Sequence, residues 1–207
     1  VEATSLIHED GKVSGLECKD IESGQTFSLR SRCVVNATGV WVDALRENDA
    51  VATGRTVHSL VAPSQGVHLV VDREFLGSDH ALMVPKTADG RVLFAVPWLG
   101  KVILGTTDTP RRDLPLEPAP LAHEVDFILR EAAKYLQRAP TRADIRSTWV
   151  GLRPLVKAGG EGGDTKAISR EHTVLVAKSG LVTVTGGKWT TYRAMAADVL
   201  ARCTQAG

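Results

Sequence analysis

The sequence predicts an α/β (α+β) fold in which antiparallel sheets carry helices on their faces. Several runs alternate apolar and polar residues with a period of two, which is typical of half-buried strands. One stretch has apolar residues at helical spacing, and two strand patterns end in glycine-containing turns that lead into helices. With 207 residues and 43% hydrophobic content, the chain can bury one large core or two small ones.

The first part of the chain predicts an antiparallel meander. Short β-rich runs extend to about Asn36 and are separated by the turn pairs Asp10-Gly11 and Ser23-Gly24. The meander leads into "CVVNATGVWVDAL", an apolar strand that ends in a turn of small residues, and a short helix carrying Trp41 and Leu45 follows. A buried strand that enters such a turn is typical of an α/β sheet.

The middle of the chain predicts a second antiparallel sheet with one covering helix. From "QGVHLVV" to "VILGTTD" the period is again close to two, and Asp89-Gly90 and Leu99-Gly100 mark turns. A proline-rich link precedes the helix, which the apolar spacing places over 121–138. Its apolar positions are Leu121, Val125, Ile128, Leu129, Ala132 and Leu136.

The last part predicts a strand around Ser147 to Val150, a glycine-rich loop over 158–166 and a strand pair around Thr173 to Val184. The stretch "VTVTGGKWTTYR" follows, and then a final helix to about Thr204. Its strand-to-helix junction invites comparison with the phosphate-binding loop of nucleotide triphosphatases. That loop requires a glycine where Val182 stands and a serine or threonine where Trp189 stands, so the pattern fails twice.

Composition excludes several classes of function. Lysine plus arginine (25) nearly cancels aspartate plus glutamate (24), so no global basic field would attract nucleic acid or an anionic membrane. Cys18, Cys33 and Cys203 have no metal or disulfide spacing, which fits a reducing compartment, and we interpret them as small buried hydrophobes. The histidines have no metal-site spacing, so we expect no metal. We also identify no signal peptide and no run long enough to span a bilayer.

Four polar side chains each allow a structural and a functional interpretation. Lys188, after Gly186 and Gly187, either begins an ordinary helix or adds charge to an anion-attracting helix N-terminus, and the motif alone favours the first. Arg153 in "GLRPL" and Arg170 in "ISREHT" either pair with carboxylates or bind an oxyanion. A histidine in an apolar strand, as in "GVHLVV", is usually structural.

Seven segments in sequence resemble the aerobic, FAD-dependent glycerol-3-phosphate dehydrogenases. They are "CVVNATGVWVD", "QGVHLVV", "VLFAVPW", "VILGTTDTP", "GLRPL", "ISREHT" and "TGGKWTTYR". The layout more distantly resembles the D-amino-acid oxidase-like flavoproteins. This resemblance implies parts of an FAD-binding domain over 1–50 and 151–207, with a substrate-binding antiparallel sheet domain over 51–150. The family's N-terminal G-x-G-x-x-G unit is absent, so the chain resembles a central-to-late fragment that we expect to be inactive alone.

The resemblance also implies roles for individual residues. His68 is the expected general base, with Lys188 as the rival, and the substrate phosphate would be bound by Arg153, Arg170 and Lys188 in one shared pocket. The FAD-binding residues would be Thr38, Gly39, Gly186, Gly187, Lys188, Trp189 and Thr190. The implied reaction converts sn-glycerol 3-phosphate into dihydroxyacetone phosphate by hydride transfer to FAD.

The family also implies a quinone acceptor, peripheral membrane association from the cytoplasmic side and a possible homodimer. Two alternatives stay open. One is a related FAD-dependent amino-acid or 2-hydroxy-acid oxidase, in which one arginine would bind a carboxylate. The other is a non-catalytic binding domain that has lost the dinucleotide-binding half.

Overall fold

The computed structural model describes residues 1–157 and 171–206, with the side chain of Ala206 excepted. The chain divides into two compact units. The first unit comprises Val1–Ala62 and Pro154–Gly207, and the second comprises Pro63–Arg153. Within the described ranges, no helix has the length and apolar character needed to cross a membrane.

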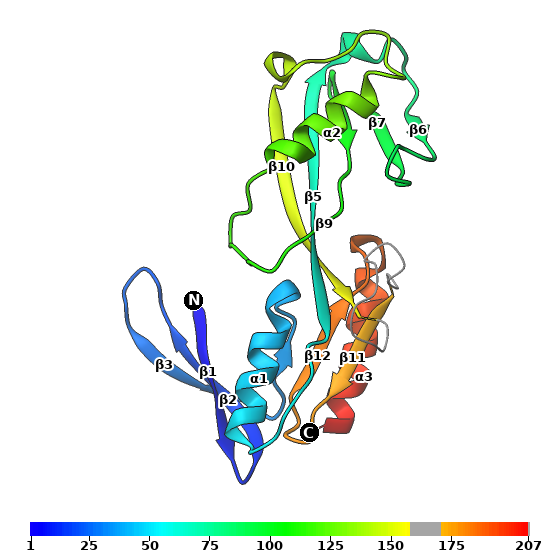
Figure 1. The fold of residues 1–207 in the computed structure, drawn as a ribbon. Helices are drawn as coiled ribbons and strands as arrows, with labels where there is room; N and C mark the ends of the chain where they lie inside the picture. The colour runs from blue at the N-terminus through cyan, green and yellow to red at the C-terminus, as the bar shows by residue number, and fades with distance from the viewer. Residues whose placement is uncertain (158–170, 207) are drawn as a thin grey trace. The chain divides into compact units, whose positions relative to one another are not determined.

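The first unit begins with the predicted meander, formed by β1 (Glu2–Glu9), β2 (Lys12–Lys19) and β3 (Thr26–Arg30) in that order (Figure 1). Asp10 and Gly11, between β1 and β2, both have positive φ angles of 50° and 74°. Two adjacent positive φ values are typical of the tight turn that matches strand twist. Local turn chemistry therefore sets the register of this hairpin.

A second, three-stranded sheet in this unit has the order β11-β12-β4. Its strands are β11 (His172–Val176), β12 (Val182–Gly186) and β4 (Val35–Asn36). β12 runs antiparallel to β11 and parallel to β4, with Val182 opposite Val35 and Thr183 opposite Asn36. β4 leads through the 3₁₀ turn η1 (Gly39–Trp41) into α1 (Val42–Ala52), so Trp41 precedes the helix that was expected to carry it.

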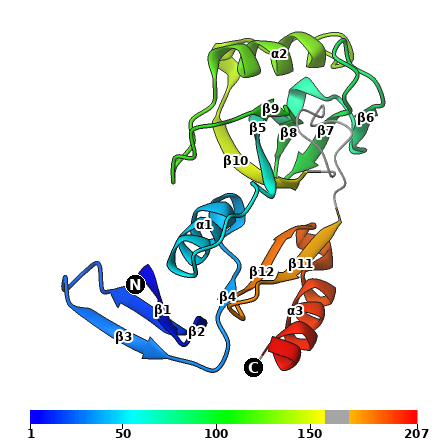
Figure 2. The same cartoon turned by 60° about the horizontal axis from the view of Figure 1, so that its bottom comes forward.

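The C-terminal helix follows β12 directly. The turn η5 (Trp189–Thr191) opens α3 (Tyr192–Ala206), which packs against β11 and β12 (Figure 2). α3 has one inward stripe at four-residue spacing, formed by Met195, Val199 and Cys203. The prediction of a strand, a glycine pair and a final helix is confirmed.

The second unit is built on a six-stranded sheet with the order β10-β5-β8-β7-β6, in which β9 also pairs with β5. The strands are β5 (Val61–Asp72), β6 (Leu82–Val84), β7 (Leu93–Trp98), β8 (Lys101–Gly105), β9 (Thr109–Pro110) and β10 (Ser147–Val156). The pairs β5 with β8, β7 with β8 and β6 with β7 are antiparallel, as the sequence predicted. Two 3₁₀ turns, η2 (Arg73–Phe75) and η3 (Arg142–Asp144), lie in the connections.

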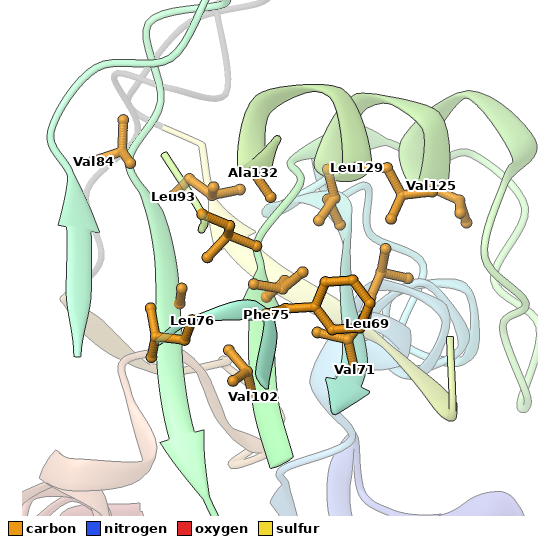
Figure 3. Close-up of a cluster of buried hydrophobic side chains, with 14 of the residues drawn as sticks. Leu69, Val71, Phe75, Leu76, Val84, Leu93, Val102, Val125, Leu129 and Ala132 are labelled. Atoms are coloured by element: carbon orange, nitrogen blue, oxygen red, sulfur yellow. The ribbon is translucent and has the colours of Figure 1, made fainter. Parts of the chain in front are cut away.

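One face of this sheet is covered by α2 (Ala122–Ala132). Val125, Leu129 and Ala132 point from the helix toward Leu69 and Phe75 in the core (Figure 3). The helix ends six residues before Arg138, the predicted end, because Lys134 and Tyr135 donate to carbonyls only three residues back. Gln137 then donates its N–H to the carbonyl of Phe75, which fixes the departing chain.

Candidate functional site

The six-stranded sheet presents two faces of different character. In β5 the odd-numbered Val67, Leu69 and Val71 are fully buried in the core beneath α2. Because side chains alternate along a strand, Gly66 and His68 lie on the opposite face. The candidate catalytic and substrate-binding residues of this unit are therefore on the face that α2 does not cover.

Arg153 lies inside β10, the seventh of its ten residues, and not after the strand end as predicted. Its Nη1 donates to the carbonyl of Thr107 at 3.0 Å, and its Nη2 donates to Oγ1 of Thr106 at 2.9 Å. Asp108 Oδ1 lies 3.7 Å from Nη1, and the arginine side chain is 32% exposed. The carboxylate-paired interpretation is thus realised, while the exposed part of the guanidinium remains able to meet a ligand.

A glycine provides the space for this guanidinium. A methyl group added to Gly66 would overlap the Cζ and both Nη atoms of Arg153. Gly151, two residues before Arg153, has no atom near the corresponding position. The sequence segment "QGVHLVV" therefore carries two linked features, a histidine and the gap that accommodates an arginine from another strand.

Replacing Gly66 by alanine is expected to displace Arg153 without unfolding the protein, because the overlapped atoms are the end of a flexible side chain. If Arg153 binds substrate, KM should rise several-fold, and melting temperature should change little. The matched control is Gly151→Ala, for which we expect an unchanged KM. Equal KM values for the two variants in steady-state kinetics would contradict the placement of the guanidinium.

His68 lies beside Arg153 and is half-buried. Its ring stacks on Trp149, with centroids 5.2 Å apart and planes 25° from parallel. It also covers Gly105, its partner across the β5 and β8 pair, where a methyl group would overlap the imidazole. Burial and the positive charge of Arg153 both lower the pKa of His68, so the neutral ring is favoured. Its Nδ1 is buried and has no hydrogen-bond partner in the described residues.

The segment "GTTDT" sends alternate side chains to the two faces. Thr106 and Asp108 face Arg153, and Asp108 also accepts a hydrogen bond from Ser64. Thr107 and Thr109 instead donate to Glu124 of α2 at 3.0 and 2.6 Å. These two threonines also line a hollow of about 400 Å³ beside α2. The segment therefore contributes polar groups to both faces of the sheet.

Glu124 holds α2 to the sheet through its buried carboxylate. Besides the two threonines, Gln65 Nε2 donates to it at 2.6 Å and the N–H of Leu121 at 2.9 Å. Burial alone would raise the pKa of Glu124, but the four hydrogen bonds outweigh it and the pKa is lowered. The ionised form is thus the one that the fold requires.

Glu124→Gln is expected to lower the free energy of unfolding by about 1–3 kcal/mol at pH 7, because an amide group must face donors that had met a carboxylate. The pKa of Glu124 is lower in the folded protein than in the unfolded chain. Ionisation of Glu124 therefore stabilises the fold above its unfolded-state pKa, and this stabilisation is lost as the pH falls through its folded-state pKa. The difference in the free energy of unfolding between Glu124→Gln and wild type should therefore become smaller at acid pH. Urea unfolding at pH 7 and at acid pH measures this difference, with Glu117→Gln at an exposed position as the control. A constant difference would contradict it.

In the first unit, the predicted cofactor-binding residues come from two turns at the same sheet edge. β4 and β12 are parallel neighbours, so both run toward the same sheet edge, where each leads through a turn into a helix. Asn36, the last residue of β4, lies opposite Thr183, and β12 continues three residues further. Thr38 and Gly39 form the turn after β4, where Thr38 donates its hydroxyl to Asn36 Oδ1 at 2.7 Å. The carboxyl ends of parallel strands are the usual ligand-binding edge of such sheets.

The turn after β12 owes its shape to two glycines with positive φ, Gly186 at 76° and Gly187 at 74°. A methyl group on Gly187 would overlap Met195 of α3, so this glycine allows the helix to pack closely. Lys188, Trp189 and Thr190 are all exposed, and the Trp189 side chain is 87% exposed. The hydroxyl oxygen of Thr191 accepts a hydrogen bond from the backbone N–H of Lys188 at 3.2 Å, which supports the start of the helix.

The structure brings together His68 and Arg153 in the second unit, and the two glycine-containing turns in the first. Lys188 belongs to the first unit, and Arg170 lies outside the described residues, as does the loop predicted over 158–166. The prediction that one pocket is shared by His68, Arg153, Arg170 and Lys188 therefore stays a prediction. Sequence reasoning missed Trp149 and Gly66, although Trp149 stands four residues before Arg153 and so on the same strand face.

Comparison with known proteins identifies the family. Residues 1–200 match the model of the family described as FAD dependent oxidoreductase. The chain is 42% identical over 191 residues to the mitochondrial glycerol-3-phosphate dehydrogenase of Homo sapiens, covering 91% of this chain and 25% of that protein. It is 35% identical over 236 residues to the corresponding Saccharomyces cerevisiae protein, covering all of this chain and 36% of that protein.

Solved structures agree with this match. The glycerol-3-phosphate dehydrogenase of Bacillus halodurans, solved with FAD, is 34% identical with a TM-score of 0.83, covering 99% of this chain and 38% of that one. The L-alpha-glycerophosphate oxidase of Mycoplasma pneumoniae, at 15% identity and a TM-score of 0.62 over 99% of this chain and 49% of that one, shares the fold. The chain spans 25% of the length of the human relative and 38% of the length of the Bacillus halodurans chain. The chain belongs to the FAD dependent oxidoreductase family.

Proposed function

We propose that the complete protein containing this chain oxidises the C2 hydroxyl of sn-glycerol 3-phosphate to a ketone, giving dihydroxyacetone phosphate. The observation that carries the proposal is the pairing of a partly exposed guanidinium and a neutral-favouring imidazole on one sheet face, Arg153 and His68. A phosphate-bearing alcohol needs both groups, one for the anion and one for the proton. The similarity to glycerol-3-phosphate dehydrogenases over 91% of the chain supports this substrate.

Arg153 is the proposed phosphate-binding residue of the second unit. Its guanidinium is held by Thr106, Thr107 and Asp108, so its direction is fixed before substrate binds. A fixed planar donor loses little side-chain entropy on binding an oxyanion. We propose that Arg170 and Lys188 add further positive charge, which would favour a phosphate dianion over a singly charged carboxylate.

His68 is the proposed base that accepts the C2 hydroxyl proton. Its stacking on Trp149 fixes the ring plane, and its lowered pKa keeps a free nitrogen lone pair available near neutral pH. Lys188 is the rival candidate or an electrostatic helper. Because Lys188 is exposed in the described structure, it would serve as a base only in a more buried, ligand-bound setting.

FAD is the cofactor of the family, and the first unit offers residues that fit it. The residues Thr38, Gly39 and 186–190 stand at the carboxyl ends of parallel strands, and a side chain at Gly39 would meet open space. The N–H groups that open the following helices can stabilise negative charge. When bound, FAD supplies the acceptor for the two electrons and the proton that leave C2 as a hydride.

We propose further that the isolated 207 residues bind FAD weakly and are inactive, since they contain no G-x-G-x-x-G turn for the pyrophosphate. For the complete protein we propose quinone as electron acceptor, peripheral association with the cytoplasmic face of a membrane, and a homodimeric state. Quinone reduction by membrane fractions, compared with hydrogen peroxide release in air, distinguishes a dehydrogenase from an oxidase.

The deciding experiment is anaerobic titration of the complete flavoprotein, followed by the visible absorption of its flavin. Glycerol 3-phosphate should bleach the flavin at micromolar to millimolar concentration. Glycerol tests the need for phosphate, and an amino acid and a 2-hydroxy acid test the carboxylate alternatives. Bleaching by a carboxylate substrate alone would overturn the proposal, and failure of every substrate would favour a non-catalytic domain.

A further inference from the structure

Two of the three cysteines approach each other in the first unit, against the expectation that all three are small buried hydrophobes. Cys18 is buried at 3% exposure, whereas Cys33 and Cys203 are half-buried. The side chains of Cys33 and Cys203 are close enough for the Cys203 thiol to raise the pKa of Cys33. All three cysteines are reduced in this structure.

The topology of the unit explains this approach. β12 begins beside β4, where Val182 donates its N–H to the carbonyl of Val34 at 3.1 Å. After β12 the chain reverses at the glycine pair, and α3 returns alongside the strand (Figure 1). Cys203, on the inward stripe near the end of α3, therefore comes back to the level where β12 and β4 begin, and Cys33 immediately precedes Val34.

We propose that Cys33 and Cys203 form a dithiol site that small disulfides such as glutathione disulfide convert into an intramolecular disulfide. One protein thiolate attacks glutathione disulfide, its S–S bond breaks, and one glutathione leaves as a thiolate that takes up a proton. The second protein thiol loses its proton and attacks the protein sulfur of this mixed disulfide, which releases the second glutathione. Two protein thiols are oxidised and one glutathione disulfide is reduced.

Cys33 is protonated at neutral pH. Burial raises the pKa of Cys33 to about 11, and the neighbouring thiol of Cys203 acts in the same direction. A thiol in this state carries little thiolate, which is the attacking species, so oxidation should be slow at neutral pH and faster as pH rises. The product would tie α3 covalently to the chain segment that enters β4.

The experiment treats the folded 207-residue chain with glutathione disulfide, quenches with acid, alkylates the remaining thiols and measures intact and peptide masses. We expect the loss of two hydrogens, one remaining alkylated cysteine at position 18, and a linked peptide pair containing Cys33 and Cys203. The matched variants are Cys33→Ser and Cys203→Ser, which should abolish the link, and Cys18→Ser, which should retain it. The oxidised wild type should also melt at a higher temperature than the reduced form.

The unfolded chain provides an internal control that requires no variant. In urea, loop closure favours a link between Cys18 and Cys33, which are far closer in sequence than Cys33 and Cys203. A link between Cys33 and Cys203 that forms in the native protein and not in urea therefore reports the fold. Glutathione adducts without an internal link, a link involving Cys18 in the native protein, or no oxidation would each overturn the proposal.

Discussion

Arg153→Ala in the complete flavoprotein is expected to raise KM for glycerol 3-phosphate by about 10- to 100-fold, with flavin content near normal. The loss of a hydrogen-bonding partner to a charged group costs about 1.5–3 kcal/mol, and each 1.4 kcal/mol corresponds to about a factor of ten in affinity. The effect should fall mainly on KM because the phosphate is remote from the reacting C2 carbon. Steady-state kinetics and flavin absorbance measure the two quantities.

Arg153 also donates hydrogen bonds to the carbonyl of Thr107 and the hydroxyl of Thr106, and it lies near the carboxylate of Asp108. Its replacement could therefore destabilise the unit, so the variant needs a stability control. Arg146→Ala is well matched, because Arg146 directly precedes β10 and is bound by Asp72 through Nε and Nη2 at 2.8 and 2.6 Å. It should leave KM unchanged. An unchanged KM in Arg153→Ala, in a protein with normal melting temperature, would remove Arg153 from the phosphate site.

Features set by local chemistry could be predicted from the sequence. Leu99 and Gly100, at the turn between β7 and β8, have φ angles of 45° and 76°, and the sequence places a turn there because glycine tolerates positive φ. The two-residue period of "GVHLVV" likewise places His68 and the buried valines on opposite faces. Such features depend on residues that are neighbours in the chain, so no tertiary information is needed.

Features set by tertiary contacts could not be predicted in the same way. β10 continues through Gly151 and Pro154, residues that normally interrupt a strand, because it lies at the edge of its sheet and one side needs no donor. The space for Arg153 is provided by Gly66 on a neighbouring strand, and Cys203 meets Cys33 only because α3 folds back. Each of these pairs joins residues that are far apart in the sequence, so the apolar pattern of one segment cannot predict it.

His68→Gln should lower the rate of flavin reduction by glycerol 3-phosphate by about 100-fold or more, because removal of a general base commonly costs 10²–10⁴-fold. Glutamine retains a similar volume and can still contact Trp149, so substrate affinity should change less than the rate. Stopped-flow absorbance of the flavin measures the step directly. His80→Gln, at an exposed position of the same unit, is the control and should react normally. A rate within a few-fold of wild type would make Lys188 the better base.

The pH dependence offers a separate test of the same assignment. Burial and the charge of Arg153 lower the pKa of His68, so in the free enzyme the acid limb of kcat/KM should lie below the ordinary histidine value of about 6.5. In the enzyme–substrate complex, the bound phosphate offsets the charge of Arg153. The acid limb of kcat, which reports on that complex, should therefore lie at higher pH than the acid limb of kcat/KM. Arg153→Gln removes that charge permanently, so its kcat/KM limb should shift upward as well. An acid limb of kcat/KM at or above the ordinary histidine value of about 6.5 in the free enzyme, or one that Arg153→Gln leaves in place, would contradict the assignment of the base to His68.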